Sequence, residues 1–308
     1  RQVHLTKSES KMDAFVHNLE QIKGFKYIIF GAKAFIENFV ETGNPSKVDI
    51  GPINTMLTSN FVDGFRTRIT AQTTAKLHKQ LFLSGYYAHG WGSHKNYYKG
   101  EFVYSFNKKE YLPREFPKRT LTLMSTYDVC SPSDKFMHTD KDNVFTSFKW
   151  AKVDKMMFYN RQQVTFEREE DWGFKTTVGL KTEENVPCGE LYFRPLSTLE
   201  NTKIRTTELR AELRFAPGET FINTKQRRLK INLDAPVFTV SHTLGLKDVL
   251  GGDYRYNYTE ASIYKRFWMN SWGKIDCYVR GGIQWDKVPF PLLCMPETNL
   301  SYIIQDFT

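Results

Sequence analysis

The sequence lacks the long apolar runs that cross a membrane as helices. Its nearest approach, Tyr27–Ala32, is ended at once by Lys33, and the mean hydropathy is −0.50. A membrane-spanning helix needs about 20 mostly apolar residues, so helical spans are excluded. A membrane β-barrel is not excluded, because its strands alternate apolar and polar residues and average to a polar composition.

Sequence motifs of catalysis and of metal binding are also lacking. The zinc-peptidase motif HExxH and the serine-hydrolase motif G-x-S-x-G do not occur. Gly251-Gly252-Asp253 is not followed by the Gly-Lys-Ser/Thr of a phosphate-binding loop, so we expect a simple bend there. No two cysteines are spaced as CxxC, which favours four unlinked thiols over a zinc or redox site. We therefore expect a protein that is not an enzyme and that holds no cofactor and no metal. The four cysteines are Cys130, Cys188, Cys277 and Cys294.

A concentrated basic patch is lacking as well, although the net charge is +9. Lysine and arginine are spread along the chain, and no RNP, zinc-finger or basic-helix motif accompanies them. This pattern predicts no nucleic-acid partner.

Helical periodicity is confined to the N-terminal residues. Met12, Phe15, Val16, Leu19 and Ile22 recur at helical spacing before Gly24. We expect a short N-terminal helical or linker segment over residues 1–25. The chain starts without methionine and ends within a strand-like pattern, so we also expect it to be part of a longer polypeptide.

Alternation of apolar and polar residues fills the rest of the chain. Residues 207–215 read TELRAELRF, in which every second residue from Leu209 to Phe215 is apolar and every residue between them is charged. Successive side chains of a strand point to opposite faces, so this stretch has one apolar and one ionic face. Roughly twelve such segments follow residue 26, many of nine or more residues, and the aromatic content is 15%. Transmembrane strands have this length, whereas strands of soluble proteins average five or six residues.

The fold class predicted from these segments is all-β, as one domain over residues 26–308. The strand lengths favour a partial antiparallel transmembrane β-barrel preceded by the short N-terminal helix. Tight turns are expected at 90–94 and 270–273, and long loops at 130–144 and 186–205. Outer-membrane barrels carry short turns at one end and long loops at the other, and we expect the same sorting here.

The charged faces of these strands supply the candidate functional residues. If the apolar faces meet lipid, the charged residues between them face a lumen, where they could pair across strands or line a pore selective for charge. Pairing in a plugged lumen is slightly favoured. The nine candidates are Arg66, Arg68, Glu208, Arg210, Glu212, Arg214, Lys274, Asp276 and Arg280.

Two further clusters have plain interpretations. His89 and His94 flank a turn, with His78 upstream, but no carboxylate or cysteine completes a metal site, so surface histidines are favoured. Glu167, Glu169, Glu170 and Asp171 form an acidic run where one strand turns into the next. Paired carboxylates can perform acid–base chemistry or hold calcium, but a solvated strand end is the favoured interpretation.

Six stretches of the chain together resemble one known family. The stretches are VDIGPINT (48–55), NFVDGFRTR (60–68), FLSGYYAHG (82–90), YSFNKKEY (104–111), YKRFW (264–268) and NLSYIIQDFT (299–308). They are similar to the barrel region of a large Bacteroidetes outer-membrane family of unknown function, in which a carboxypeptidase-regulatory-like β-sandwich precedes the barrel. The resemblance implies an outer-membrane location, lipid as a partner, an upstream regulatory-like domain and a barrel of which this chain is an incomplete portion.

The function expected on this basis is structural or transport-related at the cell envelope, with an unknown substrate. One alternative is an outer-membrane protein assembly or secretion factor, a group that the chain resembles distantly. Those factors carry a VRGF-like motif on an inward loop, whereas Val279-Arg280-Gly281 lies within a strand pattern here. The other alternative is a soluble β-sandwich that binds glycan or protein.

Overall fold

The structure is a computed structural model. It describes residues 38–132, 153–193, 203–223 and 228–289, with Gly24, Gly31, Asp134, Asp142, Gln226, Leu292 and Leu293. The predicted N-terminal helix, apart from Gly24, lies outside the described residues, as does Cys294. Over the described part of the chain, no helix has the length and apolarity that crossing a membrane requires.

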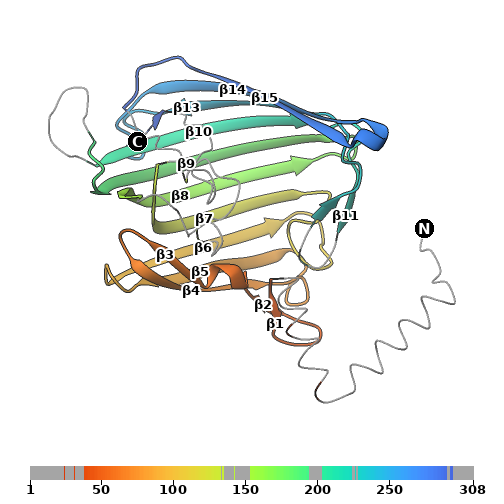
Figure 1. Ribbon diagram of the computed structural model, residues 1–308, viewed down its shortest axis with the longest axis horizontal. Helices are drawn as coiled ribbons and strands as arrows, with labels where there is room; N and C mark the ends of the chain where they lie inside the picture. Colours follow the sequence, from red (N-terminus) through yellow and green to blue (C-terminus); the bar gives the residue numbers. More distant parts are fainter. Residues whose placement is uncertain are drawn as a thin grey trace.

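The fold is all-β and antiparallel throughout, as predicted. Thirteen strands form one sheet in the order β1-β2-β4-β5-β6-β7-β8-β9-β10-β13-β14-β15, with β3 paired to β4, and a separate hairpin joins β11 to β12 (Figure 1). Ten of the strands have 9–16 residues. These long strands are β4 (Gly64–Thr73), β5 (Leu81–Gly90), β6 (Lys95–Ser105), β7 (Arg119–Cys130), β8 (Lys155–Glu169), β9 (Phe174–Gly189), β10 (Ile204–Phe215), β13 (Val237–Gly245), β14 (Tyr256–Trp268) and β15 (Lys274–Gln284).

Five short strands bring the number within the described residues to fifteen, where roughly twelve were expected for the chain. Short strands are missed because two to four residues cannot establish an alternating pattern. They are β1 (Val40–Glu41), β2 (Val48–Ile50), β3 (Leu57–Asn60), β11 (Phe221–Asn223) and β12 (Arg228–Lys230). Two short 3-10 turns, η1 (Ile53–Thr55) and η3 (Asn270–Trp272), also occur.

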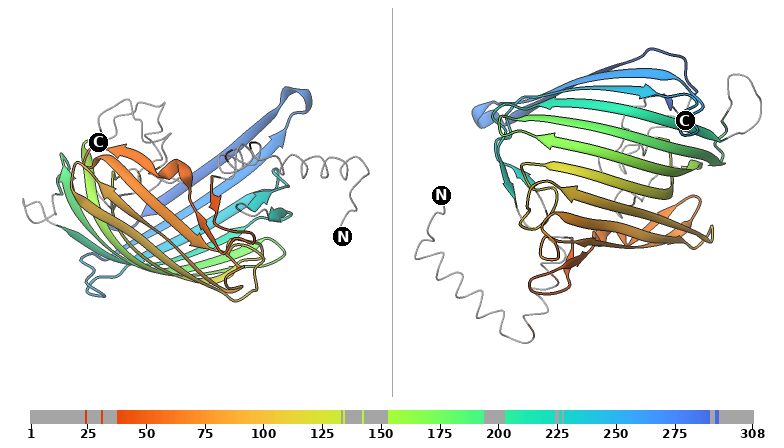
Figure 2. Two further views of the ribbon diagram at one scale, coloured as in Figure 1. Left: turned by 90° about the horizontal axis from the view of Figure 1, so that it is seen from below. Right: turned by 180° about the vertical axis from the view of Figure 1, so that it is seen from behind.

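The large sheet curls into an open trough (Figure 2). β1 and β15 are its two edges, and the described residues form no pairing between them. The predicted antiparallel sheet is therefore present, while closure into a barrel is not.

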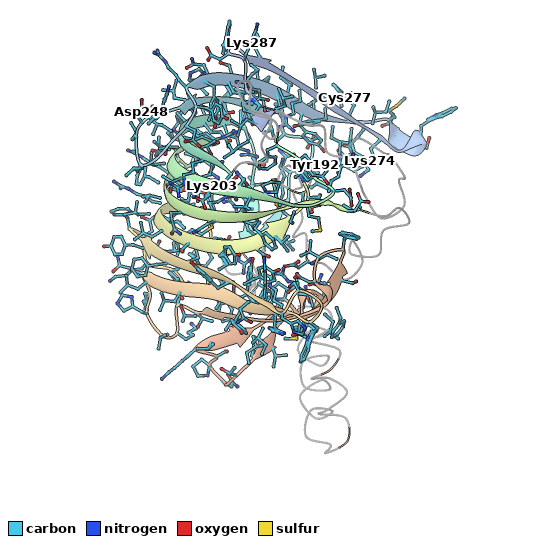
Figure 3. All side chains as sticks on the ribbon, turned by 90° about the vertical axis from the view of Figure 1, so that its left-hand side faces the viewer. Tyr192, Lys203, Asp248, Lys274, Cys277 and Lys287 are labelled. Carbon is cyan, nitrogen blue, oxygen red and sulfur yellow. The ribbon has the colours of Figure 1, made fainter. Side chains whose placement is uncertain are left out.

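The connections are not sorted by length between the two ends of the trough. We call the end where β8 turns into β9 end A, and the end where β5 turns into β6 end B. End B carries the tight turn at 91–94 and also the long connections 131–154 and 190–203, so the expected sorting is wrong. Since β5, β7 and β9 run in the same direction, the connections that follow them must share one end. Figure 3 looks onto end B, where Tyr192, Lys203 and Asp248 lie.

The two faces of the sheet have opposite chemistry. On β10, Leu209, Leu213 and Phe215 are 37–47% exposed, while the charged residues between them are half-buried. One row of directly paired outer residues crosses six strands with apolar side chains throughout: Leu83, Phe102, Leu123, Val164, Leu180 and Leu209. The concave face instead buries polar side chains, among them Thr120, Asp128, Asn185 and Thr206. A water-soluble protein has the reverse arrangement, with its apolar side chains inside.

The apolar core is correspondingly small. One cluster contains Cys130, Met157, Leu191, Phe193 and Ile204 near end B. A second contains Ala88, Tyr97, Val129 and Met156, and a third contains Ala75, Phe82 and Val103. These clusters lie toward the ends of the strands, and the middle of the concave face is polar.

Candidate functional site

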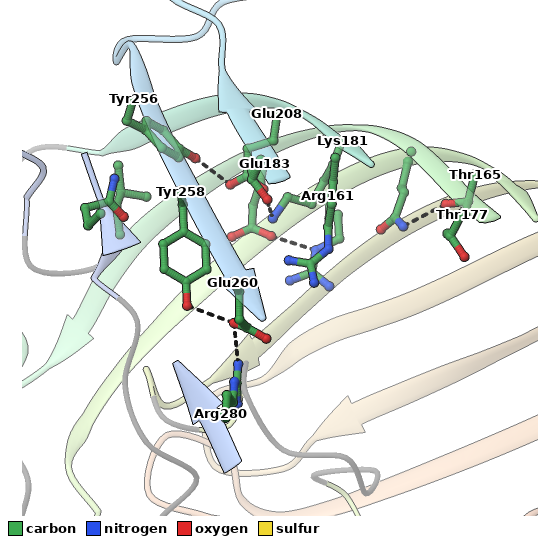
Figure 4. Close-up of a pocket in the computed structure, with 16 residues that line it drawn as sticks. Arg161, Thr165, Thr177, Lys181, Glu183, Glu208, Tyr256, Tyr258, Glu260 and Arg280 are labelled. Atoms are coloured by element: carbon green, nitrogen blue, oxygen red, sulfur yellow. Dashed lines mark hydrogen bonds and ion pairs between the residues drawn. The ribbon is translucent and has the colours of Figure 1, made fainter. Parts of the chain in front are cut away.

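A polar hollow lies on the concave face of β8–β10 and β13–β15. It has a volume of about 360 Å³, and charged side chains from neighbouring strands line it (Figure 4). Its cations are Arg161, Lys181, Arg210 and Arg280, and its carboxylates are Glu183, Glu208 and Glu260.

Three of the four cations of this hollow pair with its three carboxylates. Arg161 Nε lies 2.6 Å from Glu183 Oε2, and these residues face each other directly across β8 and β9. Lys181 Nζ lies 2.8 Å from Glu208 Oε2, again as direct neighbours, on β9 and β10. Alternation places the charged side chains on one face of each strand, and the register of neighbouring strands places opposite charges beside each other.

Two tyrosines complete the network. The hydroxyl of Tyr256 donates to Glu208 at 2.6 Å, and the hydroxyl of Tyr258 donates to Glu260 at 2.8 Å. Glu260 also accepts from Arg280 Nη2 at 2.8 Å. Glu208 and Glu260 thus accept hydrogen bonds from a tyrosine hydroxyl and from a cation at the same time.

A second group of charges is buried near the other side of the trough. We call Asp63, Arg66, Arg68, Asp128 and Asp142 the arginine–aspartate cluster. Arg66 binds Asp128 through two bonds, Nη1 to Oδ1 at 2.7 Å and Nη2 to Oδ2 at 3.0 Å. Asp142 lies 3.3 Å from Arg66 Nη2 and 3.0 Å from Arg68 Nη1. The side chains of Arg66, Asp63 and Asp128 have no exposed surface.

Aromatic rings enclose this cluster. The guanidinium of Arg66 lies 4.6 Å from the ring centroid of Tyr97, and that of Arg68 lies 3.8 Å from the ring centroid of Tyr86. The Tyr86 hydroxyl donates to Asp128, and the Tyr97 hydroxyl donates to Asp63. A buried charge needs such partners, because its desolvation is otherwise costly.

One residue from each of two connections contacts charged or polar groups of the concave face. Asp142 belongs to the connection between β7 and β8, and its carboxylate reaches Arg66 and Arg68. Gln226 belongs to the β11–β12 hairpin and donates to Asp49 of β2 at 2.6 Å. A hairpin placed between β10 and β13 can contact β2 only because the sheet is strongly curved.

The nine predicted charges do not gather into one site. Arg66 and Arg68 belong to the arginine–aspartate cluster, whereas Glu208, Arg210 and Arg280 line the hollow. Glu212 pairs with Arg210, and Arg214 binds Glu219 of the connection after β10 at 2.6 and 2.7 Å. Lys274 and Asp276 lie at the end-A part of β15, where Asp276 pairs with Arg266. That these residues face a lumen stays a prediction, because the sheet is open.

Sequence reasoning missed the partners of these charges. Arg161, Lys181, Glu183 and Glu260 each occupy an inward position of an alternating strand, so the same pattern could have found them. Asp142 carries no such signal, because it lies in a connection without periodicity.

The three histidines of the predicted cluster do not lie together. His78 precedes β5 at end A, and His89 and His94 lie at end B, so a strand of about 30 Å separates them. No group of three or more potential metal ligands is assembled by the described residues.

In the acidic run, Glu167 pairs with Lys118 and Lys175, and Glu169 pairs with Arg228. The run does mark the end of β8, but these two glutamates are paired and mostly buried, so the solvated interpretation is wrong for them.

The three described cysteines, Cys130, Cys188 and Cys277, form no disulfide with one another. The bend expected at Gly251-Gly252 is present, with Gly251 at a φ of 83°.

Comparisons with known proteins give one similarity. No match was found among curated proteins or among solved structures. A family model does match residues 141–288, the region that contains Asp142 and runs from β8 to β15. Over that region the chain is similar to the C-terminal domain of a family of unknown function, DUF5686.

Proposed function

We propose that this sheet is the wall of an outer-membrane β-barrel with lipid on its apolar face and a lumen on its polar face. The observation that carries the proposal is the inverted chemistry of the two faces. Leu209, Leu213 and Phe215 are exposed, whereas Arg66, Asp128 and Asn185 are buried. An uncovered apolar face over so many strands would aggregate in water, and lipid hydrocarbon is the solvent that it fits.

The position of the outer apolar residues shifts along the strands from β5 to β14, and this shift supports the same proposal. The pairing row that begins at Leu83 on β5 arrives at Asn257 on β14. On the outer face of β14 the exposed large apolar residues are Ile263 and Phe267, further toward end A. Strands of a closed barrel are tilted by roughly 35–45°, so a band at constant height must shift along successive strands in this way.

The paired lumen charges favour a filled barrel with a structural or anchoring role over an open pore. Arg161, Lys181 and Arg280 each have a carboxylate partner in the hollow, and Asp142 and Gln226 bring two connections onto the concave face. A route for solute would have to pass these groups. Transport remains the second candidate because the hollow of about 360 Å³ lies among them.

The test of the barrel uses the full chain expressed with an export signal. The protein should remain in the membrane pellet after alkaline extraction and should migrate differently on a gel when boiled and unboiled. Recovery in the aqueous fraction, with identical migration in both states, would favour the soluble alternative. Conductance in planar bilayers then separates a filled barrel, which gives a closed baseline, from a pore.

The two alternatives have less support. Val279-Arg280-Gly281 lies inside β15, so the described residues do not place it on an inward loop as in assembly factors. A β-sandwich would cover the apolar face with a second sheet, and the described strands of the large sheet have none packed there. Depletion of the protein should leave the assembly of other barrels unchanged, and an assembly defect would favour the secretion alternative.

A further inference from the structure

Two arginines face each other on the outer, apolar side of the sheet near end A. Arg119 on β7 and Arg168 on β8 are directly paired in the register of the two strands. Both are exposed, and they share the outer face with Leu121 and Phe166. Like charges placed directly opposite one another repel, so this arrangement is unfavourable unless an anion lies between them.

Protein partners neutralise this pair only in part. Arg168 pairs with Glu170, but its side chain is still 52% exposed. Arg119 contacts the ring of Phe106, with 5.7 Å to the ring centroid. Within the described residues, no carboxylate lies at ion-pair distance from Arg119. At end B, the outer-face residue Arg205 instead has Glu184 as its partner.

Aromatic side chains flank the arginine pair on both sides. Phe106 packs edge-on against Phe166, with 6.1 Å between ring centroids. Trp172 stacks on Phe174 at 5.0 Å and is 60% exposed. Aromatic rings of membrane barrels gather at the level of the lipid headgroups, where arginine side chains can reach phosphate.

Further basic residues surround the pair at the same end. Lys79 and Lys108 are both exposed and lie in connections joined by the hydrogen bond from Lys109 N to Lys79 O. Glu110 and Asp171 are exposed at the same end as well. Basic side chains at a membrane surface favour anionic headgroups over neutral ones.

We propose that Arg119 and Arg168 bind the phosphate of an anionic lipid headgroup on the outer face near end A. The guanidinium groups donate to the phosphate oxygens, and the rings of Phe106 and Trp172 lie beside the glycerol and upper acyl region. This inference rests on the proposed barrel, and it adds the chemical class of the lipid and the place where the lipid binds.

The test reconstitutes the full chain into vesicles of neutral phosphatidylcholine, with and without anionic phosphatidylglycerol. Anionic lipid should raise the thermal unfolding midpoint of the wild type by about 2–4 °C. The R119Q/R168Q variant should lose this increase. R210Q removes one cation from the concave face and should keep it. An equal increase in R119Q/R168Q would overturn the proposal.

Two further arms identify the source of the effect. Inorganic phosphate added to neutral vesicles should not reproduce the increase; if it does so in full, the pair binds free phosphate and the lipid assignment is overturned. Insertion of the wild type into neutral vesicles is measured first by protease protection. Wild type that inserts but shows no anionic-lipid effect overturns this inference alone, whereas wild type that does not insert overturns the proposed barrel and the inference with it.

Discussion

Arg66 and Asp128 form a two-point ion pair, 62 residues apart in sequence, with no exposed surface on either side chain. The Tyr86 hydroxyl also donates to Asp128, and the ring of Tyr97 covers Arg66. Such a pair ties β4 to β7 across the concave face, because β5 and β6 lie between these strands. The arginine–aspartate cluster therefore fixes the curvature of this part of the trough.

Substitution of Asp128 should destabilise the fold strongly. In D128N, the buried Arg66 loses its two-point partner and keeps only the longer contacts with Asp63 and Asp142. Loss of a buried partner costs up to about 3–5 kcal/mol. Urea unfolding of the purified protein measures the change. E212Q is the matched control, because the Glu212–Arg210 pair is 29% and 43% exposed and contributes at most about 1 kcal/mol. Equal losses in D128N and E212Q would contradict the structural role given to the cluster.

A charge on the apolar face should prevent stable membrane insertion. Leu209 is 38% exposed, lies in the middle of β10 and is paired with Leu180 in the apolar row that begins at Leu83. For L209R we expect a cost of roughly 2–4 kcal/mol, the value for arginine at the middle of a bilayer. Recovery in the membrane fraction and the heat-modified gel band measure it, with T239Q on the concave side of β13 as the control. If L209R inserts as well as the wild type, the apolar face does not meet lipid.

Gly90 should not tolerate a side chain. A Cβ at this position would lie 2.2 Å from Asp63 Oδ1, and Asp63 already accepts hydrogen bonds from Ser93 and Tyr97. We expect G90A to cost about 1–3 kcal/mol, because a crowded buried site must shift to admit the methyl group. G100A is the control, since a Cβ there meets nothing within 4 Å. Comparable unfolding midpoints in urea for the two variants would show that the turns at end B are not locked by Asp63.

Acid should weaken the contact between β10 and the β11–β12 hairpin. Burial raises the pKa of Glu219, but hydrogen bonds and charges from Arg214 and Lys230 outweigh burial and hold that pKa below its ordinary value of 4.5. A carboxylate with a depressed pKa in the folded state stabilises the fold above its unfolded pKa. That contribution is lost as the pH falls through the lower, folded value.

The measurement is the thermal midpoint of wild type and E219Q between pH 7 and pH 3. The wild type should be the more stable protein at pH 7, and the difference should shrink once the pH falls below about 4.5. A difference that stays constant over this range would mean that Glu219 does not titrate as proposed.

The sequence by itself determined the local elements and the chemistry of their two faces. The alternation in TELRAELRF assigned Leu209 and Leu213 to one side of β10 and Glu208 and Arg210 to the other, as found. Side-chain direction along a strand depends only on the parity of position, so a single chain segment contains this information.

Tertiary structure alone decided which charges meet. Register placed Lys181 opposite Glu208, and curvature brought Asp142 to Arg66 and Gln226 to Asp49. It also placed His78 and His89 at opposite ends and put tight and long connections at the same end. Contacts between residues far apart in sequence depend on strand order and on the bending of the whole sheet, which no local pattern encodes.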